Sequence, residues 1–444
     1  MKKKLIISIL VVTLGWGFAN AGTWEEFRTD FAPNARIGHV AIYDPNSDAM
    51  VVMGEAGATD QNIYSLDLGT GEWIIKSSSE ATVARADHSI VYDSSRNRAL
   101  VFGGSTLGRQ DVNGYENVTY YWNFATPAWG AITTTGTAPM DRIDHSAIYD
   151  SANDCMIVFG GIGDDGLYKN DVYSLDLATA VWSQITTSGT APQSRFKHSA
   201  IYDSTNNRML MLGGSSALSL AHSDLWALDL RTDPGTFAWS QLSTTGDTFP
   251  GRTGQSIVFD PDTGTQGSII VFGGMDPLAI EYKNDTYILD IATLTWSKVE
   301  PGLVPPSRRT DHVAVYDTDN NRMFIFGGYS GTSNLNSCYT LDITDRWPSD
   351  SDDSEVFNYP NPFKAGAENT NITFYMQSAG KVNIKIYTLV GGLVKTWSLN
   401  SSRGINKVVW DGKNGEEKVV GNGGYICVVE KPNSNIKFKI AVAK

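Results

Sequence analysis

Six copies of one residue pattern run through residues 36–342, and this repetition constrains the fold more than any other feature of the chain. Each copy opens with an arginine, and the six arginines follow one another at nearly equal steps. A unit of this size cannot bury its own apolar face, so the copies must pack against one another around an axis. The recurring positions are the arginines Arg36, Arg85, Arg142, Arg195, Arg252 and Arg309, the histidines His39, His88, His145, His198 and His312, and the tryptophans Trp24, Trp73, Trp129, Trp182, Trp239 and Trp296.

Each copy is predicted to form four strands, here called a to d. Strand a runs from the histidine to a Tyr-Asp pair, as in His145 to Tyr149. Strand b is an apolar run that ends at a glycine doublet, as in Met156 to Phe159 before Gly160-Gly161. Strand c carries Tyr-x-Leu-Asp, and strand d starts at the tryptophan. Wholly apolar b strands are typical of strands buried on both faces, so the pattern predicts an all-β ring of four-stranded sheets.

The tryptophan spacing predicts how the ring closes. Five tryptophans precede the next arginine by 12 or 13 residues, and Trp24 precedes the first arginine by 12. The chain therefore starts with a strand d that has no a, b and c strands before it. The copy opened by Arg309 has a, b and c strands but lacks that spacing after them, so we expect residues 24–27 to complete its sheet and remove a free edge. Trp347 is the rival, but Pro348 follows it and disfavours a continued ladder.

This pattern resembles the kelch repeat, which has a period of roughly 50 residues and four strands in each blade. The resemblance implies a six-bladed kelch-type β-propeller over residues 22–347. Departures from the pattern are local: Gly54-Glu55 replaces a glycine doublet, Asn123 replaces the aspartate of strand c, and Gln255 and Phe259 replace histidine and tyrosine. Because a fold alone does not license a reaction, function has to be argued from individual residues.

The N-terminus and the net charge bound where the protein acts. Residues 1–21 combine a basic start, a short apolar run and Ala19-Asn20-Ala21, the parts of a secretory signal peptide cleaved after Ala21. The run is shorter than the ~20 residues that span a bilayer, so no transmembrane anchor is expected after cleavage. A net charge of −13 argues against nucleic acid and anionic membrane surfaces as partners. The chain is therefore predicted to be extracytoplasmic, either secreted or on a bacterial-type cell surface.

The repeated polar residues are interpreted as structural. Histidines on separate sheets are too dispersed for a tetrahedral metal site. The arginines are expected to pair with an aspartate of strand c or with backbone carbonyls, although a cationic mouth that holds a carboxylate or sulfate stays open. Asp317-x-Asp319-x-Asn321 lacks the glycine and glutamate of a calcium loop and fits a capped hairpin. Cys155 and Cys338 are expected to be small buried hydrophobes, and no metal, cofactor or catalytic residue is predicted.

Binding specificity is expected in the b–c loops, because they vary in length and sequence while the a–b turns are short and uniform. These loops share one face of the ring with the d–a connections. Residues that break the repeat on this face are better candidates than residues that make it. The candidates are Arg109, Asp111, Tyr115, Glu116, Asp164, Asp165, Tyr168, His222, Asp276, Glu281, Tyr282, Lys283 and Tyr329.

Kelch propellers include enzymes, and the resemblance raises two as alternatives to binding. Galactose-oxidase-like propellers hold copper with tyrosines, histidines and a Cys–Tyr crosslink, but His222 is the only histidine outside the repeat position. A sialic-acid epimerase-like site needs a tuned base beside a sugar-carboxylate clamp, and no spacing links Glu116, Glu281 or His222 to an arginine. The preferred interpretation is therefore a module that binds a protein or a glycan on the loop face.

Residues 348–355 form a polar, acidic linker, and residues 356–444 form a further domain. About seven short runs alternate with period two, as in 370–376, which predicts an immunoglobulin-like β-sandwich. Trp410-Asp411-Gly412 and the later Gly-Gly-Tyr425 resemble the Ig-like domain of flagellar hook-capping proteins and the C-terminal sorting domains of type 9 secretion substrates. The resemblance implies export through outer-membrane secretion machinery, with a plain structural appendage as the alternative.

Overall fold

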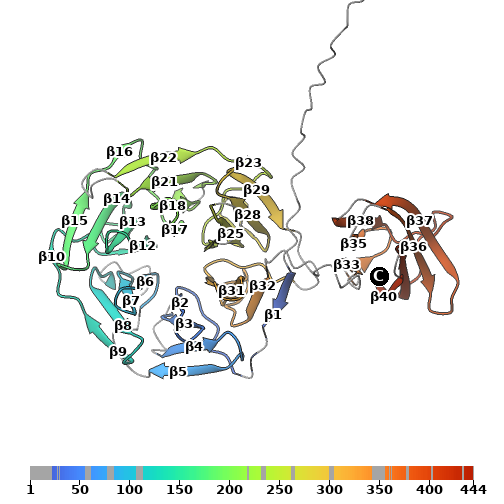
Figure 1. Cartoon of the computed structure of the whole chain (residues 1–444), viewed down its shortest axis with the longest axis horizontal. Coiled ribbons are helices and arrows are strands. Elements are labelled where there is room, and N and C mark those ends of the chain that lie inside the picture. The colour runs from blue at the N-terminus through green and yellow to red at the C-terminus, as the bar shows by residue number, and fades with distance from the viewer. Residues whose placement is uncertain are drawn as a thin grey trace, which may run out of the picture.

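The computed structural model describes residues 23–27, 29, 31–55, 62–77, 85–106, 114–217, 220–231, 237–261, 266–299, 305–342, 356–359, 361, 363–376, 380–401, 404–432 and 435–443. Within these residues every regular element is a strand (Figure 1). The expected signal peptide, Trp347 and the acidic linker lie outside them. In the same set of residues, no helix has the length and apolarity needed to cross a membrane.

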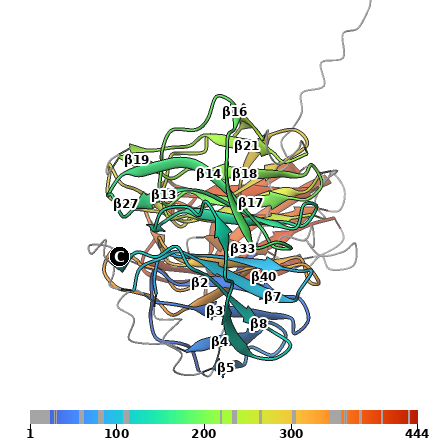
Figure 2. The same ribbon diagram turned by 90° about the vertical axis from the view of Figure 1, so that its left-hand side faces the viewer.

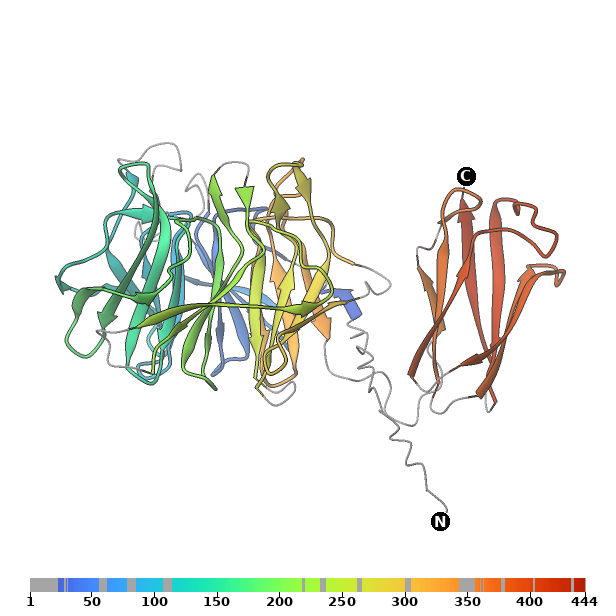
Figure 3. The same cartoon turned by 90° about the horizontal axis from the view of Figure 1, so that it is seen from above.

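The strands between residues 23 and 342 form sheets arranged around an axis, seen end-on in Figure 1 and from the sides in Figures 2 and 3. In each sheet strand a pairs with b, b with c and c with d, all antiparallel, and the a strands of successive sheets are neighbours around the axis. In this order the strands are β2 (Val40–Asp44), β3 (Ala49–Met53), β4 (Ile63–Asp67) and β5 (Trp73–Ser77); β6 (Ser89–Asp93), β7 (Arg98–Phe102), β8 (Thr119–Asn123) and β9 (Ala128–Ala131); β12 (Ser146–Asp150), β13 (Cys155–Gly163), β14 (Tyr168–Asp176) and β15 (Val181–Ile185); β17 (Ser199–Asp203), β18 (Arg208–Leu212), β21 (Leu225–Asp229) and β22 (Ala238–Leu242); β24 (Ser256–Asp260), β25 (Ser268–Phe272), β28 (Thr286–Asp290) and β29 (Thr295–Val299); and β30 (Val313–Asp317), β31 (Arg322–Phe326) and β32 (Cys338–Asp342), followed by β1 (Thr23–Glu26).

The N-terminal strand β1 completes the sheet of the last copy. It pairs antiparallel with β32, and Trp24 lies opposite Leu341. The Trp24 side chain is 1% exposed, and its ring centroid lies 4.7 Å from that of Phe272 in the preceding sheet. Its indole N–H donates a hydrogen bond of 3.0 Å to the hydroxyl of Thr286. This is the pairing that the tryptophan spacing predicts, and it joins the two ends of the ring.

Short parallel strands tie neighbouring sheets together at the outer rim. β10 (Thr135–Gly136), β16 (Ser188–Gly189) and β23 (Thr245–Gly246) each follow a d strand and pair with the d strand of the next sheet. The glycine is required in each case. At Gly136, φ is 81°, and a Cβ atom would lie 2.2 Å from the carbonyl oxygen of Trp182. These strands were not predicted, because two residues are too few to show a period.

A belt of backbone hydrogen bonds runs around the axis at the start of the a strands. Each donor is the residue just before the repeat histidine, or before Gln255, and its partner is the equivalent residue of the preceding copy. The amides of Asp87, Asp144, Lys197, Gly254 and Asp311 donate to the carbonyls of Gly38, Asp87, Asp144, Lys197 and Gly254, at 2.9–3.1 Å. This belt fixes the spacing of the sheets at one mouth of the ring.

Residues 356–443 form two further sheets that enclose a core of their own. One contains β33 (Val356–Tyr359), β35 (Thr370–Met376) and β38 (Gly404–Trp410). The other has the order β34 (Phe363–Lys364), β40 (Asn435–Ala443), β39 (Gly423–Glu430), β36 (Gly380–Thr388) and β37 (Leu393–Ser401). Trp410 of the first sheet and Ile384 and Cys427 of the second are fully buried in the same cluster. Alternating apolar residues therefore face inward, as the period of two predicts.

Candidate functional site

The b–c connections of three consecutive copies are hairpins on one face of the ring, where irregular loops were expected. β13 and β14 continue past the glycine doublet to Gly163 and Tyr168, with a register shift after Phe159. In the next two copies, β19 (Ser215–Ala217) pairs with β20 (Leu220–Ala221), and β26 (Met275–Asp276) pairs with β27 (Glu281–Tyr282). Backbone pairing therefore presents the variable residues on short ribbons rather than on irregular loops.

Aliphatic side chains project into solvent at the tips of these three hairpins. Leu167 is 62% exposed, Leu220 53%, Leu278 76% and Ile280 71%. Ile280 also has a φ of 52°, a conformation in which a β-branched residue is strained. A backbone conformation of this kind costs about 1–3 kcal/mol. These four residues were not predicted, because the candidates on the loops were polar or aromatic side chains.

Tyr282 and Tyr329 are brought together from different copies. Their ring centroids lie 5.7 Å apart in an edge-to-face arrangement, and the Tyr329 hydroxyl donates to the carbonyl of Gly331 at 3.0 Å. The Tyr282 ring lies against Gly331, where a Cβ atom would approach it to 2.7 Å. These two predicted residues therefore form one aromatic wall beside the β26–β27 hairpin.

Most other candidate side chains pair within their own hairpin. Lys283 contacts Glu281 at 2.7 Å, and Asp165 contacts Lys169 at 2.6 Å. Asp276 accepts the backbone amides of Leu278 and Ala279 and so shapes the turn below the exposed tip. The remaining placements on this face are Asp164, whose amide donates to the carbonyl of Asp141, and Tyr168, whose ring stacks on Phe196 with centroids 4.9 Å apart.

One equivalent position in three copies is occupied by Glu116, His222 and Lys283, which were predicted as separate breaks in the repeat. The backbone carbonyl of each accepts the amide of the next copy's arginine, at 3.0–3.3 Å. The structure also brings two of these residues to arginines to which no sequence spacing linked them. Glu116 contacts Arg85 at 2.8 Å, and burial, and then the charge of the nearby Arg195, lowers the pKa of His222. Tyr115 is buried, and its backbone forms an isolated antiparallel β-bridge with Ser105. Arg109 and Asp111 lie outside the described residues.

The repeat arginines are buried and engaged internally. The Arg142 side chain donates to the carbonyl of Gly160 at 2.9 Å and forms a two-pronged pair with the Asp171 carboxylate at 2.7 and 3.1 Å. Arg195 and Arg252 repeat this arrangement with Asp224 and Asp285. These three arginines therefore link strand b to strand c, or to the residue just before it, within each sheet. The charge of each is paired with an aspartate, so it is not available to bind an anionic ligand.

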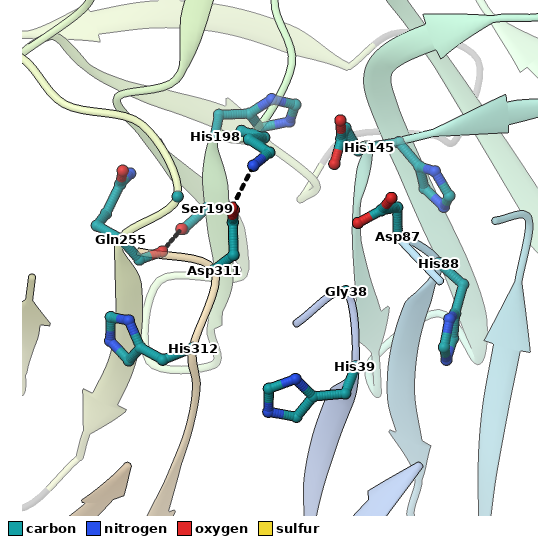
Figure 4. A pocket seen from close by; sticks show the side chains of 13 residues that line it. Gly38, His39, Asp87, His88, His145, His198, Ser199, Gln255, Asp311 and His312 are labelled. Carbon is teal, nitrogen blue, oxygen red and sulfur yellow. Dashed lines mark hydrogen bonds and ion pairs between the residues drawn. The ribbon is translucent and has the colours of Figure 1, made fainter. Parts of the chain in front are cut away.

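A cavity of about 150 Å³ lies at the axis on the hairpin face (Figure 4). Its polar lining includes Asp87, Asp144, Lys197 and Asp311, and Lys197 is paired with Asp311 across the mouth. These are the residues just before the repeat histidines. These residues were not predicted as a site, although four of the six positions before the histidine position carry a charged side chain in the sequence.

The repeat histidines lie between neighbouring copies, and their position calls for a hydrogen-bond donor. His39 Nε2 lies 3.3 Å from the carbonyl of Phe326, and in the fifth copy the amide nitrogen of Gln255 donates to the equivalent carbonyl of Leu212 at 2.9 Å. Because a carbonyl can only accept, the proton of His39 is assigned to Nε2. Gln255 is thus a functional replacement for histidine in the inter-sheet contact.

Burial keeps these histidines neutral, which predicts acid sensitivity. Burial, and then the charge of the neighbouring Arg195, lowers the pKa of His198 from 6.5 to about 3. The unfolded chain therefore binds a proton below pH ~6.5 that the folded chain does not. The stabilisation by neutral His198 is complete above that pH and is lost as the pH falls towards 3.

Replacing His198 with glutamine, the residue that the fifth copy uses, is expected to preserve the fold and reduce this sensitivity. For one such group, the free energy of unfolding should fall by about 2 kcal/mol between pH 7 and pH 5, and His198→Gln should remove that part. Urea unfolding at both pH values measures the difference. An unchanged pH dependence in the variant would show that His198 is protonated in the folded state.

A second, wider cavity lies at the opposite end of the a strands. It is not the preferred candidate for a specific binding site. Its volume is about 540 Å³. The tyrosines that line it bond to repeat turn residues: Tyr149 donates to Asp154 at 3.0 Å, and Tyr202 to Asn207 at 2.9 Å. These side chains repeat from copy to copy and hold the a–b turns, so they serve the ring itself.

Comparison with known proteins supports the sequence pattern. Residues 94–263 and 232–356 match the family described as the KLHDC2/KLHL20/DRC7 Kelch-repeats domain. Acyl-CoA-binding domain-containing protein 4 of Arabidopsis thaliana is 28% identical over 321 residues, which cover 67% of this chain and 45% of that protein. Host cell factor 1 of Homo sapiens is 28% identical over 243 residues, which cover 52% of this chain and 11% of that protein. This chain therefore spans less than half the length of these relatives.

Among solved structures, that of YjhT superimposes with a TM-score of 0.56 at 16% sequence identity. The match covers 72% of this chain and 98% of YjhT. At this level of identity the likeness concerns the fold alone.

Proposed function

This chain belongs to the Kelch-repeat family, and we propose that its hairpin face binds a protein ligand. The observation that carries the proposal is the row of exposed aliphatic tips, Leu167, Leu220, Leu278 and Ile280, on three consecutive hairpins of one face. Exposed apolar side chains grouped on a rigid scaffold are typical of protein–protein contacts. The aromatic wall of Tyr282 and Tyr329 lies beside them and adds the residue type that dominates such interfaces.

We further propose that the ring is a six-bladed propeller closed by β1, and that residues 356–444 form an Ig-like domain. We also propose that the chain is exported with a signal peptide that is then cleaved, and that its C-terminal domain directs its delivery. The signal-like sequence of residues 1–21 and the Trp-Asp-Gly motif support it. Removal of residues 355–444 should then leave the protein inside the cell envelope; unchanged delivery would contradict a sorting role.

A sugar-active enzyme is the second candidate, and the hairpin face favours it less. Such a site needs a base beside a cationic clamp for a sugar carboxylate. Here Arg142, Arg195 and Arg252 are each saturated by a carbonyl and an aspartate. The axial cavity of about 150 Å³ is also smaller than the ~300–1,000 Å³ usual for small-molecule sites.

Selection of a displayed peptide library against the protein tests the proposal, with a glycan array as the competing readout. We expect peptides with apolar residues to be selected, and the double variant Leu278→Asp/Ile280→Asp to bind them more than tenfold more weakly, because each buried aliphatic side chain contributes about 1.5–3 kcal/mol.

The matched control is Ile74→Asp/Ile75→Asp, which places the same charges at exposed isoleucines of the outer strand β5. It should bind like the unmodified chain, and thermal melting should show that both variants are folded. Equal weakening by both double variants, or a selected glycan whose binding ignores the tips, would contradict the proposal.

A further inference from the structure

The C-terminal domain has a charge opposite to the rest of the chain. Residues 356–444 contain 12 lysines and arginines against 5 aspartates and glutamates, a net charge of +7, whereas residues 1–355 carry −20. The net charge of the whole chain, −13, hides this separation. The negative net charge of the whole chain therefore does not keep this domain from anionic surfaces, because charges interact over about 8–10 Å at physiological salt.

Strand register places lysines of β40 on the outer face of the five-stranded sheet. The sheet itself is seen in Figure 1. Cys427 of β39 is fully buried in the core, so its neighbours Ile426 and Val428 face outward. Lys439 pairs with Ile426, and Lys437 pairs with Val428, so both lysines lie on this outer face. Both are exposed.

The adjoining strand β36 extends this mixture of charge and apolar surface. Lys385 pairs with Val428, and Tyr387 with Ile426, so each lysine of β40 begins a row that crosses β39 and reaches β36. The ammonium group of Lys385 contacts Glu430 at 2.6 Å. The outer face therefore combines ammonium groups with partly exposed apolar side chains, and β40 contributes two of its lysines.

An apolar turn continues this face at the end of β36. Tyr387 pairs with Leu393, which is 60% exposed, and the turn between them presents Leu389 and Val390, which are 61% and 95% exposed. The amide of Gly391 donates to the carbonyl of Thr388 at 2.9 Å, which closes the turn. The turn is thus preformed, and its aliphatic side chains are exposed to solvent.

We propose that this face of the C-terminal domain docks on the surface of an anionic lipid bilayer. The lysines of β40 contact lipid phosphates, and Leu389 and Val390 enter the boundary between headgroups and acyl chains. Basic residues beside a small apolar insertion are the two elements of interfacial membrane binding. The aliphatic turn favours lipid over nucleic acid, which offers phosphates without an apolar phase.

Sedimentation with vesicles of phosphatidylcholine that contain phosphatidylglycerol as the anionic minor component tests the proposal. The protein used is residues 22–444, so that the apolar N-terminal run cannot insert. Lys437→Gln/Lys439→Gln is expected to weaken binding about 25-fold, since each lysine near such a surface contributes about fivefold. Leu389→Asp/Val390→Asp should also weaken it by about tenfold or more. Vesicles of phosphatidylcholine alone should bind far less.

The matched control is Lys76→Gln/Arg231→Gln, which removes two charges from the ring, one on β5 and one just after β21, and should leave vesicle binding unchanged. Equal weakening by this control would overturn the proposed face. Loss with the lysine variant but not with the turn variant, or equal affinity for a short DNA duplex, would show a general polyanion site and overturn the assignment to lipid.

Discussion

Replacing Arg142 with methionine is expected to lower the free energy of unfolding by about 3–5 kcal/mol. The Arg142 side chain is fully buried and bonds both oxygens of Asp171 and the carbonyl of Gly160. Its loss leaves a partly buried carboxylate and a buried carbonyl without their donor, and the cost of an unmatched buried group exceeds the value of the bond itself. Urea denaturation at pH 7 measures the difference.

The control for this prediction is Arg231→Met. Arg231 forms an ion pair of similar length with Asp229, 2.7 Å, but its side chain is 67% exposed. Solvent screens such a pair, so its loss should change stability by less than about 1 kcal/mol. If the two variants lose similar stability, burial is not what makes the repeat arginines structural.

Replacing Trp24 with alanine is expected to cost about 3–5 kcal/mol, because a large buried side chain is removed from a packed core. Trp24 also bonds Thr286 and packs on Phe272, so the variant disturbs two sheets and their shared edge. We expect β1 to release first, which would expose the edge of β32 and increase hydrogen exchange along residues 338–342.

The control for Trp24→Ala is Phe31→Ala. Phe31 is also an aromatic residue near the N-terminus and comes shortly after β1, but its side chain is 51% exposed. Its loss should change stability by roughly 0.5 kcal/mol. A Trp24→Ala variant that keeps full stability and slow exchange in β32 would mean that the ring closes without β1.

The parts of this fold that could be predicted are those with a fixed spacing. The interval from each tryptophan to the next arginine is set by one strand and one connection. This fixed interval predicted that the strand of Trp24 pairs with the sheet of the copy that Arg309 opens. The parts that could not be predicted have no period. A two-residue strand such as Thr135–Gly136 pairs with a sheet roughly 45 residues away and leaves no local pattern.

The same reason explains what was missed on the candidate face. Glu116, His222 and Lys283 differ in side chain, yet their common role belongs to the backbone carbonyl, which no residue type reveals. From hydrophobicity alone, Leu278 and Ile280 would be predicted to be buried. Only the hairpin geometry shows that they point into solvent.

The most direct test of the account is hydrogen–deuterium exchange of the protein with and without a selected peptide. Binding at the hairpin face predicts slower exchange in β13–β14, β19–β20 and β26–β27, with no change in the a–b turns around Tyr149 and Tyr202. Protection confined to those turns, at the opposite mouth of the ring, would contradict the proposed binding face.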